Sequence, residues 1–336
     1  MSQLMFESHA PPIRFLQFNV ENLFLYMDLY DKQDLSKINE DTWQKYSSSV
    51  TPNKSLHKTR QVARLILESK ADIVMLNEVG GEESIKNFCH HFLGDEYIPL
   101  LKEGNSNRGI DVGYLLRKDL QVKPVLISHK NRPINFLYPR EKQTPAGGKS
   151  HYFSRDVAEL RLFAPGENSP RLVILLTHLK SKLDPEMKDV EGRLRRRAEL
   201  ETLVQIYNEV RTELNQKVPV IVAGDFNGIA RRGDNEPEFE MLHEKTDLIE
   251  VLEVANVNPE ERFSQVQIYT GAPLKKLQID YIFVSPELKD QIVPEETGIR
   301  FFKNDLNQPI PVPKSLEERN RLPSDHYPLQ LTLRKI

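Results

Sequence analysis

The chain has 336 residues, 39% of them apolar and 28% charged, so it can bury a core and lies outside the composition range of disordered proteins. Its 46 basic and 49 acidic residues give a net charge of −3, so only a local basic patch could attract nucleic acid. The single cysteine, Cys89, excludes an intrachain disulfide and a cysteine-based zinc cluster. We find no apolar run of membrane-spanning length and no secretory signal in residues 1–12, and therefore expect a cytoplasmic protein without a membrane partner.

Short apolar runs of strand length recur along the chain. They are rich in Val, Ile, Leu, Phe and Tyr, and each ends in polar residues, which is typical of β-strands. Two stretches, 73–76 and 218–223, are continuously apolar, as in strands covered on both faces. The predicted strands are residues 14–20, 72–79, 112–117, 157–163, 171–179, 218–225, 277–285 and 329–334.

Helices are predicted between the strands at 56–69, 84–92 and 189–214, where apolar residues follow a helical spacing. We expect Cys89, in the second of these, to be a small buried apolar residue. Strands separated by single helices, together with direct strand-to-strand steps, indicate two sheets packed face to face with helices outside. We expect a single domain over 1–336, enlarged by long polar insertions of the kind that usually form functional rims or mobile segments. The insertions lie near residues 26–55, 130–150, 228–265 and 294–324.

The predicted strands end on a uniform set of carboxylates, carboxamides and imidazoles. Because strand ends converge on one rim of a sheet sandwich, we expect these side chains to lie together. Carboxylate and carboxamide oxygens suit Mg²⁺ or Mn²⁺, and a histidine oriented by a carboxylate can act as a general acid or base. The set therefore predicts metal-assisted hydrolysis of a phosphate ester. Its members are Asn19, Asn77, Glu78, His178, Asp225, Asn227, Asp280, Asp325 and His326.

Each of these residues alone also has a purely structural interpretation. Glu78 and Asp280 are acids in apolar surroundings, and such acids need a cation or a strong donor. The Gly-Asp-Phe-Asn sequence at 224–227 is also typical of a simple turn. Residues 325–326 are compatible with a helix cap or a surface pair, and His178 with an ordinary histidine at a strand end. The specificity therefore lies in the whole set rather than in any member.

Six short sequence blocks contain these residues. They are Phe-Asn-Val (18–20), Asp-Ile-Val-Met-Leu-Asn-Glu-Val (72–79), Thr-His-Leu (177–179), Gly-Asp-Phe-Asn (224–227), Ile-Asp-Tyr-Ile (279–282) and Ser-Asp-His-Tyr-Pro-Leu (324–329). By these blocks and their order, residues 14–335 resemble the endonuclease/exonuclease/phosphatase superfamily, which has the deoxyribonuclease I-like fold. One departure is Asn77, where the family usually has Gln before the glutamate.

The resemblance implies a four-layer α/β sandwich, in which two packed mixed β-sheets are flanked by helices and one active site lies at a sheet rim. It implies that Glu78 is the main metal ligand and that Asn19 and Asp325 complete or orient the metal site. The expected cofactor is Mg²⁺ or Mn²⁺, with Ca²⁺ as a further candidate.

The same resemblance implies roles for five catalytic residues. Asp225 would position or activate the attacking water, and Asn227 would hold the phosphate or that water. His326 would be a catalytic imidazole oriented by Asp280. His178 would contact the phosphate or protonate the leaving oxygen.

Two shorter matches add candidates. The sequence at 153–156 resembles the deoxyribonuclease I segment whose arginine contacts phosphate, which makes Arg155 a phosphate-binding candidate; the alternative is a surface salt bridge. The sequence at 108–112 precedes a strand at the place where that enzyme has an acid supporting its first histidine. Asp111 is therefore a candidate partner of His178.

Basic residues follow His178. Lys180 and Lys182 stand beside it, and arginines at 193–197 open the next predicted helix. They favour a polyanion near the site, with Lys180 a candidate phosphate contact. The alternative for the arginines is a solvated helix face paired with nearby glutamates.

The fold alone does not select the substrate. The His-Leu-Lys-Ser-Lys sequence at 178–182 resembles bacterial nuclease-like members of the superfamily, so we predict a monomeric phosphodiesterase that is a DNA endonuclease. Acidic stretches at 234–240 and 317–318 would repel long duplex DNA if they flanked the cleft, so a phosphatase or phosphodiesterase for a small molecule is the alternative. A non-catalytic binding module on the same scaffold is less favoured, because every expected catalytic residue type is present.

Overall fold

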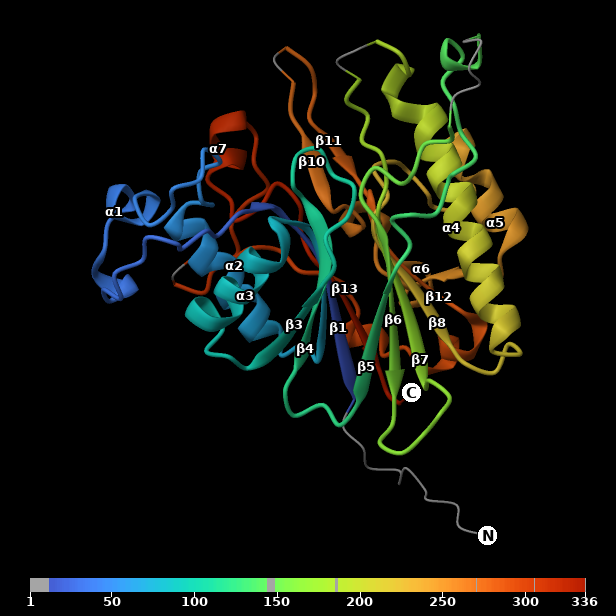
Figure 1. The fold of residues 1–336 in the computed structure, drawn as a ribbon, viewed down its shortest axis with the longest axis horizontal. Helices are drawn as coiled ribbons and strands as arrows, with labels where there is room; N and C mark the ends of the chain where they lie inside the picture. The colour runs from blue at the N-terminus through green and yellow to red at the C-terminus, as the bar shows by residue number, and fades with distance from the viewer. Residues whose placement is uncertain (1–11, 144–148, 185–186, 270, 305, 336) are drawn as a thin grey trace.

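The computed structural model describes residues 12–143, 149–184, 187–269, 271–304 and 306–335, and its centre is a pair of six-stranded mixed sheets (Figure 1). Residues 1–11, in the segment where no secretory signal is predicted, lie outside the described residues. The first sheet has the order β13 (Gly298–Ile299), β14 (Leu329–Leu333), β1 (Ile13–Leu23), β2 (Ile73–Val79), β4 (Asp111–Arg117) and β3 (Tyr97–Leu101). The second has the order β5 (Lys123–Ser128), β6 (Val157–Phe163), β7 (Leu172–His178), β8 (Val220–Asp225), β12 (Asp280–Val284) and β9 (Ile249–Glu250). A separate hairpin joins β10 (Gln265–Gln267) and β11 (Lys275–Leu277).

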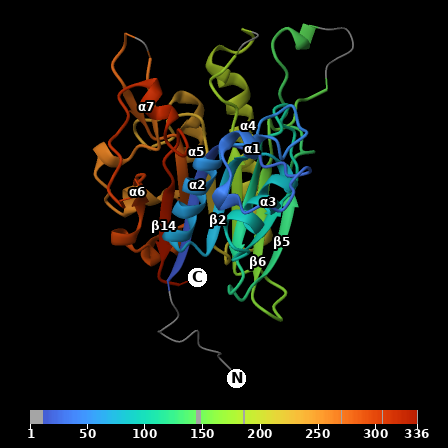
Figure 2. The same cartoon turned by 90° about the vertical axis from the view of Figure 1, so that its left-hand side faces the viewer.

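Helices cover the outer faces of both sheets, which completes the four layers that the sequence predicts (Figures 1 and 2). On the side of the first sheet lie α1 (Glu40–Gln44), α2 (Leu56–Ser69), α3 (Gly81–Phe92) and α7 (Leu316–Asn320). On the side of the second lie α4 (Arg193–Glu213) and α5 (Glu240–Lys245), and α6 (Val251–Val254) follows β9. Short 3₁₀ helices are Leu35–Lys37, Glu141–Gln143, Val190–Gly192, Pro237–Phe239, Pro259–Glu261, Pro286–Gln291 and Pro294–Glu296. Among the described residues, no helix is long and apolar enough to cross a membrane.

The layers are held by three apolar cores, one between the sheets and one beneath each layer of helices. Strand β2 shows how one strand serves two of them. Its Ile73 and Met75 belong to the core between the sheets, and Val74 and Leu76 belong to the core under α2 and α3. Successive side chains of a strand point to opposite faces, so a strand buried on both faces is continuously apolar.

Several differences separate the predicted from the observed elements. The predicted strand 277–285 is divided, because β11 ends at Leu277 and β12 begins at Asp280. The strands β3 and β5 were not expected, because Pro99 and Pro124 interrupt their patterns; both strands lie at a sheet edge, where proline is tolerated. The long helix was expected to begin at 189, but α4 begins at Arg193. Glu191 and Gly192 have φ values of 55° and 63°, a left-handed conformation that cannot continue an α-helix.

Candidate active site

The predicted polar strand ends meet at one rim of the sandwich, at the upper end of the sheets in Figure 1. In the first sheet β1 and β2 are parallel and β14 is antiparallel to β1, so the start of β14 lies beside the ends of β1 and β2. In the second sheet β7 and β8 are parallel, and antiparallel β12 places Asp280 directly opposite Asp225. Residues far apart in the sequence are therefore brought to one place by strand topology.

The imidazole of His326 is held by the carboxylate of Asp280. The Nδ1 atom of His326 lies 2.6 Å from Oδ2 of Asp280, and Oδ1 of Asp280 accepts a hydrogen bond from the amide of Gln17 at 3.0 Å. Burial alone would favour the neutral ring, but the carboxylates of Asp280 and Asp325 outweigh it and raise the pKa of His326 well above its ordinary value. The contact is the one expected of an acid that orients a catalytic imidazole, and its catalytic role stays a prediction.

Asp225, at the end of β8, connects the two sheets. Its Oδ2 accepts a hydrogen bond from Nδ2 of Asn19 at 3.0 Å and lies 3.4 Å from Nε2 of His178. Its Oδ1 accepts one from the backbone N–H of Asn227 at 2.8 Å. Burial and the negative charge of Asp280 raise the pKa of Asp225 to about 7. A carboxyl that titrates near neutral pH is suited to exchange a proton with water.

Glu78 lies at an irregularity of β2, where the pairing with β4 shifts register between Asn77 and Val79. Its φ of 65° is unusual for a residue with a side chain and redirects the strand end. Its Oε2 accepts a hydrogen bond from the backbone N–H of Asn22 at 3.1 Å, and its Oε1 lies 4.0 Å from Nε2 of His178. The carboxylate is therefore aimed at the rim.

Two sets of side chains at the rim have donor atoms suited to a divalent metal ion. Asp225, Asp280 and His326 each offer one ligand atom, and these atoms lie within 4.8 Å of one another. Asp280 and His326, however, already bond to each other, which suits them to proton transfer. The side chains of Glu78 and Asp325 are 14% and 25% exposed, so a cation held by either carboxylate could keep water ligands, as Mg²⁺ does. Carboxylate oxygens are suited to the predicted metal, and the role of Glu78 and Asp325 as its ligands stays a prediction.

His178 is buried without its predicted acidic partner. Its Nδ1 has no hydrogen-bond partner within the part of the chain that the structure describes. Asp111 instead accepts a hydrogen bond from the backbone N–H of Gly104 at 2.7 Å, because the loop before β4 folds back onto this carboxylate. Burial, followed by the positive charge of Arg155, lowers the pKa of His178 well below its ordinary value. His178 is therefore a neutral imidazole in this arrangement.

Besides His178, the three other predicted phosphate contacts have different surroundings. Arg155 is buried rather than on the surface, and its Nη1 donates to the carbonyl of Leu179 at 3.2 Å. The side-chain amide of Asn227 donates to the same carbonyl at 3.0 Å, which brings the two donors together. The ammonium of Lys180 binds carbonyl oxygens of its own loop, including that of Ser181 at 3.0 Å. In this arrangement Lys180 stabilises the loop after β7, and its contact with phosphate stays a prediction.

The arginines at 193–197 also have different surroundings. Arg195 lies 3.4 Å from Glu199, which is the expected pairing on a helix face. Arg196 is fully buried and forms an ion pair with Glu238, so it is neither a phosphate contact nor part of a solvated face. The interior environment of this residue was not expected from the charged pattern.

Gln265 was not expected at the site. Its side-chain amide lies 2.9 Å from Nε2 of His326, the ring nitrogen that faces away from Asp280. A neutral imidazole can accept from the amide nitrogen, and an imidazolium can donate to the amide oxygen after the amide rotates. No sequence signal indicates this contact, because it depends on where the β10–β11 hairpin packs.

Two further residues at the site had weak sequence signals. Gln17 is fully buried and its amide also donates to the side chain of Asn77 at 2.9 Å. Gln17 stands two residues before Asn19, on the same face of the otherwise apolar run 15–20, a pattern that could have indicated it together with Asn19. Arg108 belongs to the 108–112 match, and its positive charge contributes to lowering the pKa of His178.

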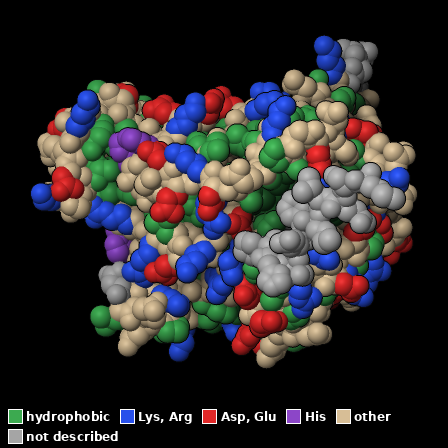
Figure 3. Space-filling model, turned by 90° about the horizontal axis from the view of Figure 1, so that it is seen from below, with side chains coloured by type: hydrophobic (Ala, Val, Ile, Leu, Met, Phe, Trp, Pro, Cys, Tyr) green, Lys and Arg blue, Asp and Glu red, His purple; other side chains and the backbone are tan. Residues whose placement is uncertain are grey.

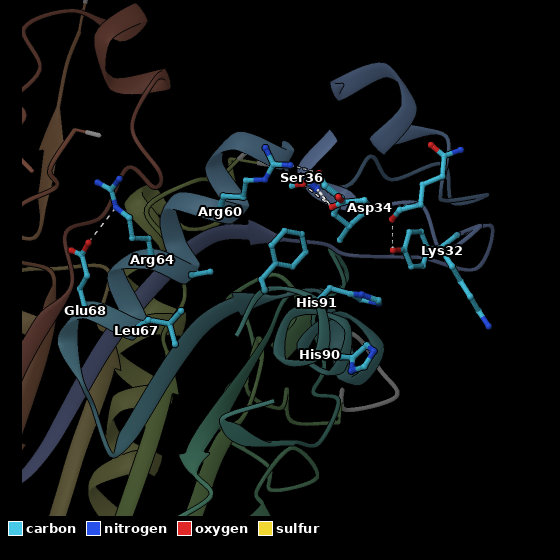
Figure 4. Close-up of a pocket in the computed structure, with 14 residues that line it drawn as sticks. Lys32, Asp34, Ser36, Arg60, Arg64, Leu67, Glu68, His90 and His91 are labelled. Carbon is cyan, nitrogen blue, oxygen red and sulfur yellow. Dashed lines mark hydrogen bonds and ion pairs between the residues drawn. The ribbon is translucent and has the colours of Figure 1, made fainter. Parts of the chain in front are cut away.

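Among the described residues, no comparable group of metal-ligating side chains lies elsewhere on the molecule. A hollow of about 710 Å³ lies outside the first sheet, between α2, α3 and residues 30–36 (Figure 4). Several of its charged groups are already paired, Arg64 with Glu68 at 3.4 Å and His90 with Asp95 at 2.9 Å. The end of the sandwich opposite the rim shows positive and negative side chains interspersed (Figure 3). The rim is therefore the better candidate for catalysis.

Comparison with known families agrees with this geometry. The model of the endonuclease/exonuclease/phosphatase family matches residues 16–326. The chain belongs to this family. Enzymes of the family hydrolyse phosphate esters and generally depend on a divalent metal ion. No curated protein sequence matches the chain significantly.

The chain is also similar in fold to solved structures of TDP2 and Nocturnin. Truncated TDP2 from Caenorhabditis elegans is 16% identical with a TM-score of 0.54, over 96% of this chain and 97% of that one. TDP2 from D. rerio, complexed with a single-strand DNA product, is 15% identical with a TM-score of 0.55, over 96% and 99%. The human Nocturnin catalytic domain with a bound sulfate is 16% identical with a TM-score of 0.56, over 96% and 93%. At identities of 15–16%, this structural similarity establishes the fold of the present chain.

Proposed function

We propose that this chain is a Mg²⁺- or Mn²⁺-dependent phosphodiesterase that cleaves DNA. The observation that carries the proposal is the Asp280–His326 pair at 2.6 Å, which stands beside Asp225 and within one rim with Glu78. An oriented imidazole, a carboxyl of near-neutral pKa and a partly exposed acid are the groups that hydrolysis of a phosphodiester requires.

Each group would have one task. Glu78, with Asp325 and Asn19, would hold the metal ion, which when bound neutralises charge on the phosphoryl oxygens. Asp225 would orient the attacking water and take its proton, since its pKa of about 7 leaves a basic fraction at neutral pH. His326, held by Asp280, would stabilise the negative charge that develops on a phosphoryl oxygen.

The remaining donors would bind the phosphate. The side-chain amide of Asn227 and the guanidinium of Arg155 both lie at the Leu179 carbonyl, and Arg155 is close enough to Asp225 and Glu78 for their charges to affect it. Displacing these weak carbonyl contacts with an anionic oxygen would strengthen both interactions, because hydrogen bonds to charged groups are stronger.

The charge around the rim supports a nucleic-acid substrate more than the sequence alone did. Within the acidic stretch 234–240, Glu238 forms an ion pair with Arg196, Glu236 with Lys182, and Asp234 with Arg231. These acids are therefore neutralised inside the chain, and they repel a polyanion less than their number in the sequence implies.

The test is cleavage of plasmid DNA, labelled single- and double-stranded oligonucleotides, RNA and a phosphate monoester in the presence of Mn²⁺. We expect DNA cleavage that Glu78→Ala and His326→Ala each reduce by about 10²-fold or more. Glu82→Ala and His57→Ala, which change exposed residues of the same types, should leave cleavage unchanged. Release of phosphate from the monoester without DNA cleavage would instead favour a small phosphorylated substrate. No turnover of any ester would indicate a binding module.

A further inference from the structure

We propose that Lys54 is a positioning residue for the metal ligand Glu78, and that it acts through the peptide group between Glu21 and Asn22. The inference rests on the proposed metal-binding role of Glu78. Lys54 lies in the insertion at 26–55, which neither the motifs nor the proposed mechanism assigns to the site.

One peptide group connects the lysine to the glutamate. Its carbonyl, that of Glu21, accepts a hydrogen bond from Nζ of Lys54 at 2.9 Å. Its N–H, that of Asn22, donates to Oε2 of Glu78 at 3.1 Å. An ammonium at one end and a carboxylate at the other polarise the peptide in the same direction, so each hydrogen bond strengthens the other.

The peptide needs such support because its backbone is strained. Glu21 and Asn22 have φ values of 48° and 55°, in the left-handed region that residues with side chains adopt at an energetic cost. They lie where the pairing of β1 with β2 shifts register, between Asn19 and Leu23. A backbone of this kind persists when its surroundings fix it, and Lys54 is one of the groups that do so.

Lys54 itself is rigidly held. Its side chain is 4% exposed, its backbone N–H donates to the carbonyl of Phe24 at 2.9 Å, and its own carbonyl accepts from the indole N–H of Trp43 at 2.8 Å. Burial lowers the pKa of Lys54 to about 8, against the opposing effect of the Glu21 carboxylate, so the amine remains mostly protonated at pH 7. Burying an ammonium is costly, and an apolar residue would fill this space more cheaply if packing were its only role.

Lys58 provides a matched control. It approaches the same residue, with its Nζ 3.1 Å from Oε2 of Glu21, but it binds the carboxylate and not the peptide carbonyl. Substituting Lys58 therefore removes a nearby positive charge without removing the support of the peptide.

Positioning and simple electrostatics predict opposite signs for metal binding. If Lys54 contributed only a positive charge near Glu78, its removal would tighten the binding of a cation. If Lys54 holds the peptide that orients Glu78, its removal loosens the ligand and weakens binding, as loss of a group that orients a metal ligand commonly does by about 10- to 100-fold.

The experiment is a calorimetric titration of the purified full-length protein with Mn²⁺, together with electron paramagnetic resonance of free Mn²⁺. For Lys54→Met we expect a Kd about tenfold higher, and for Lys58→Met a change within about threefold. At saturating Mn²⁺ the kcat of Lys54→Met should return to within about threefold of wild type, which a general loss of structure would not allow. An unchanged or lower Kd in folded Lys54→Met would overturn the proposal.

Two additional variants keep the outcomes distinct. If Lys54→Met does not fold by circular dichroism, Lys54→Gln supplies the test, because its shorter neutral side chain does not reach the carbonyl; an unchanged Kd there would also overturn the proposal. Glu78→Gln should abolish Mn²⁺ binding. If Glu78→Gln binds Mn²⁺ as the wild type does, the proposed metal site is wrong. If Glu78→Gln loses Mn²⁺ binding while both Lys54 variants retain it, only the positioning role of Lys54 is wrong.

Discussion

Asn19 of the first sheet and Asp225 of the second meet across the rim, with Nδ2 of Asn19 donating to Oδ2 of Asp225 at 3.0 Å. The carbonyl of Asn19 also accepts from the hydroxyl of Ser324, directly before Asp325 and His326. Through its side chain and its backbone carbonyl, Asn19 thus connects its own strand end to Asp225 and to Ser324. The geometry of the rim depends on how the two sheets are stacked, and this contact is part of what sets it.

We predict that Asn19→Ala lowers kcat for a phosphodiester by about 10- to 100-fold, because Asp225 loses the donor that orients it and the metal site loses a carboxamide. The measurement is steady-state hydrolysis at saturating Mn²⁺. Asn87→Ala is the control, because its amide donates to the carbonyl of Leu25 at 2.8 Å, away from the catalytic residues. The Asn19 side chain differs in that it also accepts from the backbone N–H of Glu21 at 3.0 Å. Equal losses in both variants would show that Asn19 contributes to stability rather than catalysis.

Asp280→Asn tests the orientation of His326 while its imidazole ring is still present. An amide in place of the carboxylate cannot stabilise a positive ring or accept from Nδ1 in the same way, so the tautomer and charge of His326 change. We expect kcat to fall on the order of 10²- to 10⁴-fold, the usual range for general acid–base groups, with a smaller change in KM. Comparison with His326→Ala checks the mechanism. The double variant Asp280→Asn, His326→Ala should be no slower than the slower of the two single variants, because the two residues act as a unit. Additive losses would contradict this pairing.

Gln265→Ala tests whether the amide at Nε2 of His326 competes with substrate. A substrate oxygen that uses this nitrogen must first displace Gln265, at 2.9 Å, and a hydrogen bond contributes about 1 kcal/mol net. We therefore expect KM to fall about fivefold while kcat changes by less than about threefold. Gln121→Ala, at an exposed glutamine between β4 and β5, should change neither. A rise in KM would mean that Gln265 binds the substrate instead.

Sequence reasoning was most successful where the chemistry is local. Each continuously apolar run, such as 73–76, became a strand buried on both faces, and the acids and imidazoles that end these strands reached one rim. The contact between Asp280 and His326 could be expected because both lie at strand ends that the family motifs place together. Strand periodicity and the order of the motifs thus predict most of the fold and the central residues of the site.

What the sequence did not reveal depends on loop packing. Asp111 was expected beside His178, but a turn of its own loop provides a closer donor in Gly104. Gln265 and Lys54 lie in polar stretches without a regular pattern, and their partners are determined only when the hairpin and the 26–55 insertion pack against the rim. Such contacts are set by tertiary packing, which leaves no periodic signal in the chain.

Asp156 gives a prediction for stability against pH. Its Oδ1 accepts from the backbone N–H of His129 at 2.9 Å, whereas its buried Oδ2 has no hydrogen-bond partner among the described residues. Burial raises the pKa of Asp156 to about 6, above the value of 3.8 for a free carboxyl, so the folded state binds more protons between these values. The contribution of this group to stability is therefore present below about pH 4 and is lost as the pH rises to about 6.

The matching experiment is urea unfolding of wild type and Asp156→Asn from pH 4 to pH 8. The variant lacks the titration, so its free energy of unfolding relative to wild type should rise by on the order of 2 kcal/mol between pH 4 and pH 7 and stay level above. A constant difference for Asp156→Asn would mean that this carboxyl titrates alike in both states.

Arg196 gives a prediction for the stability of the rim loops. This fully buried arginine pairs with Glu238, and its Nη1 donates to the carbonyls of Lys180 at 3.2 Å and Glu191 at 2.8 Å. Arg196→Met leaves the carboxylate of Glu238 buried without its partner, which should lower the free energy of unfolding by about 3–5 kcal/mol. Arg197→Met, at an exposed position of the same helix, should change it by less than about 0.5 kcal/mol.

The double variant Arg196→Met, Glu238→Leu separates the two contributions of the pair in the same urea unfolding experiment. Removing both charges relieves the unpaired carboxylate, so stability should recover by about 1–3 kcal/mol relative to Arg196→Met. The carbonyls of Lys180 and Glu191 would still lack their donor, and because these loops flank His178 and Asp225, catalysis should recover less than stability does. Full recovery of both would show that the arginine serves only to neutralise Glu238, and no recovery of stability would show that its hydrogen bonds to the loop carbonyls matter more than the ion pair.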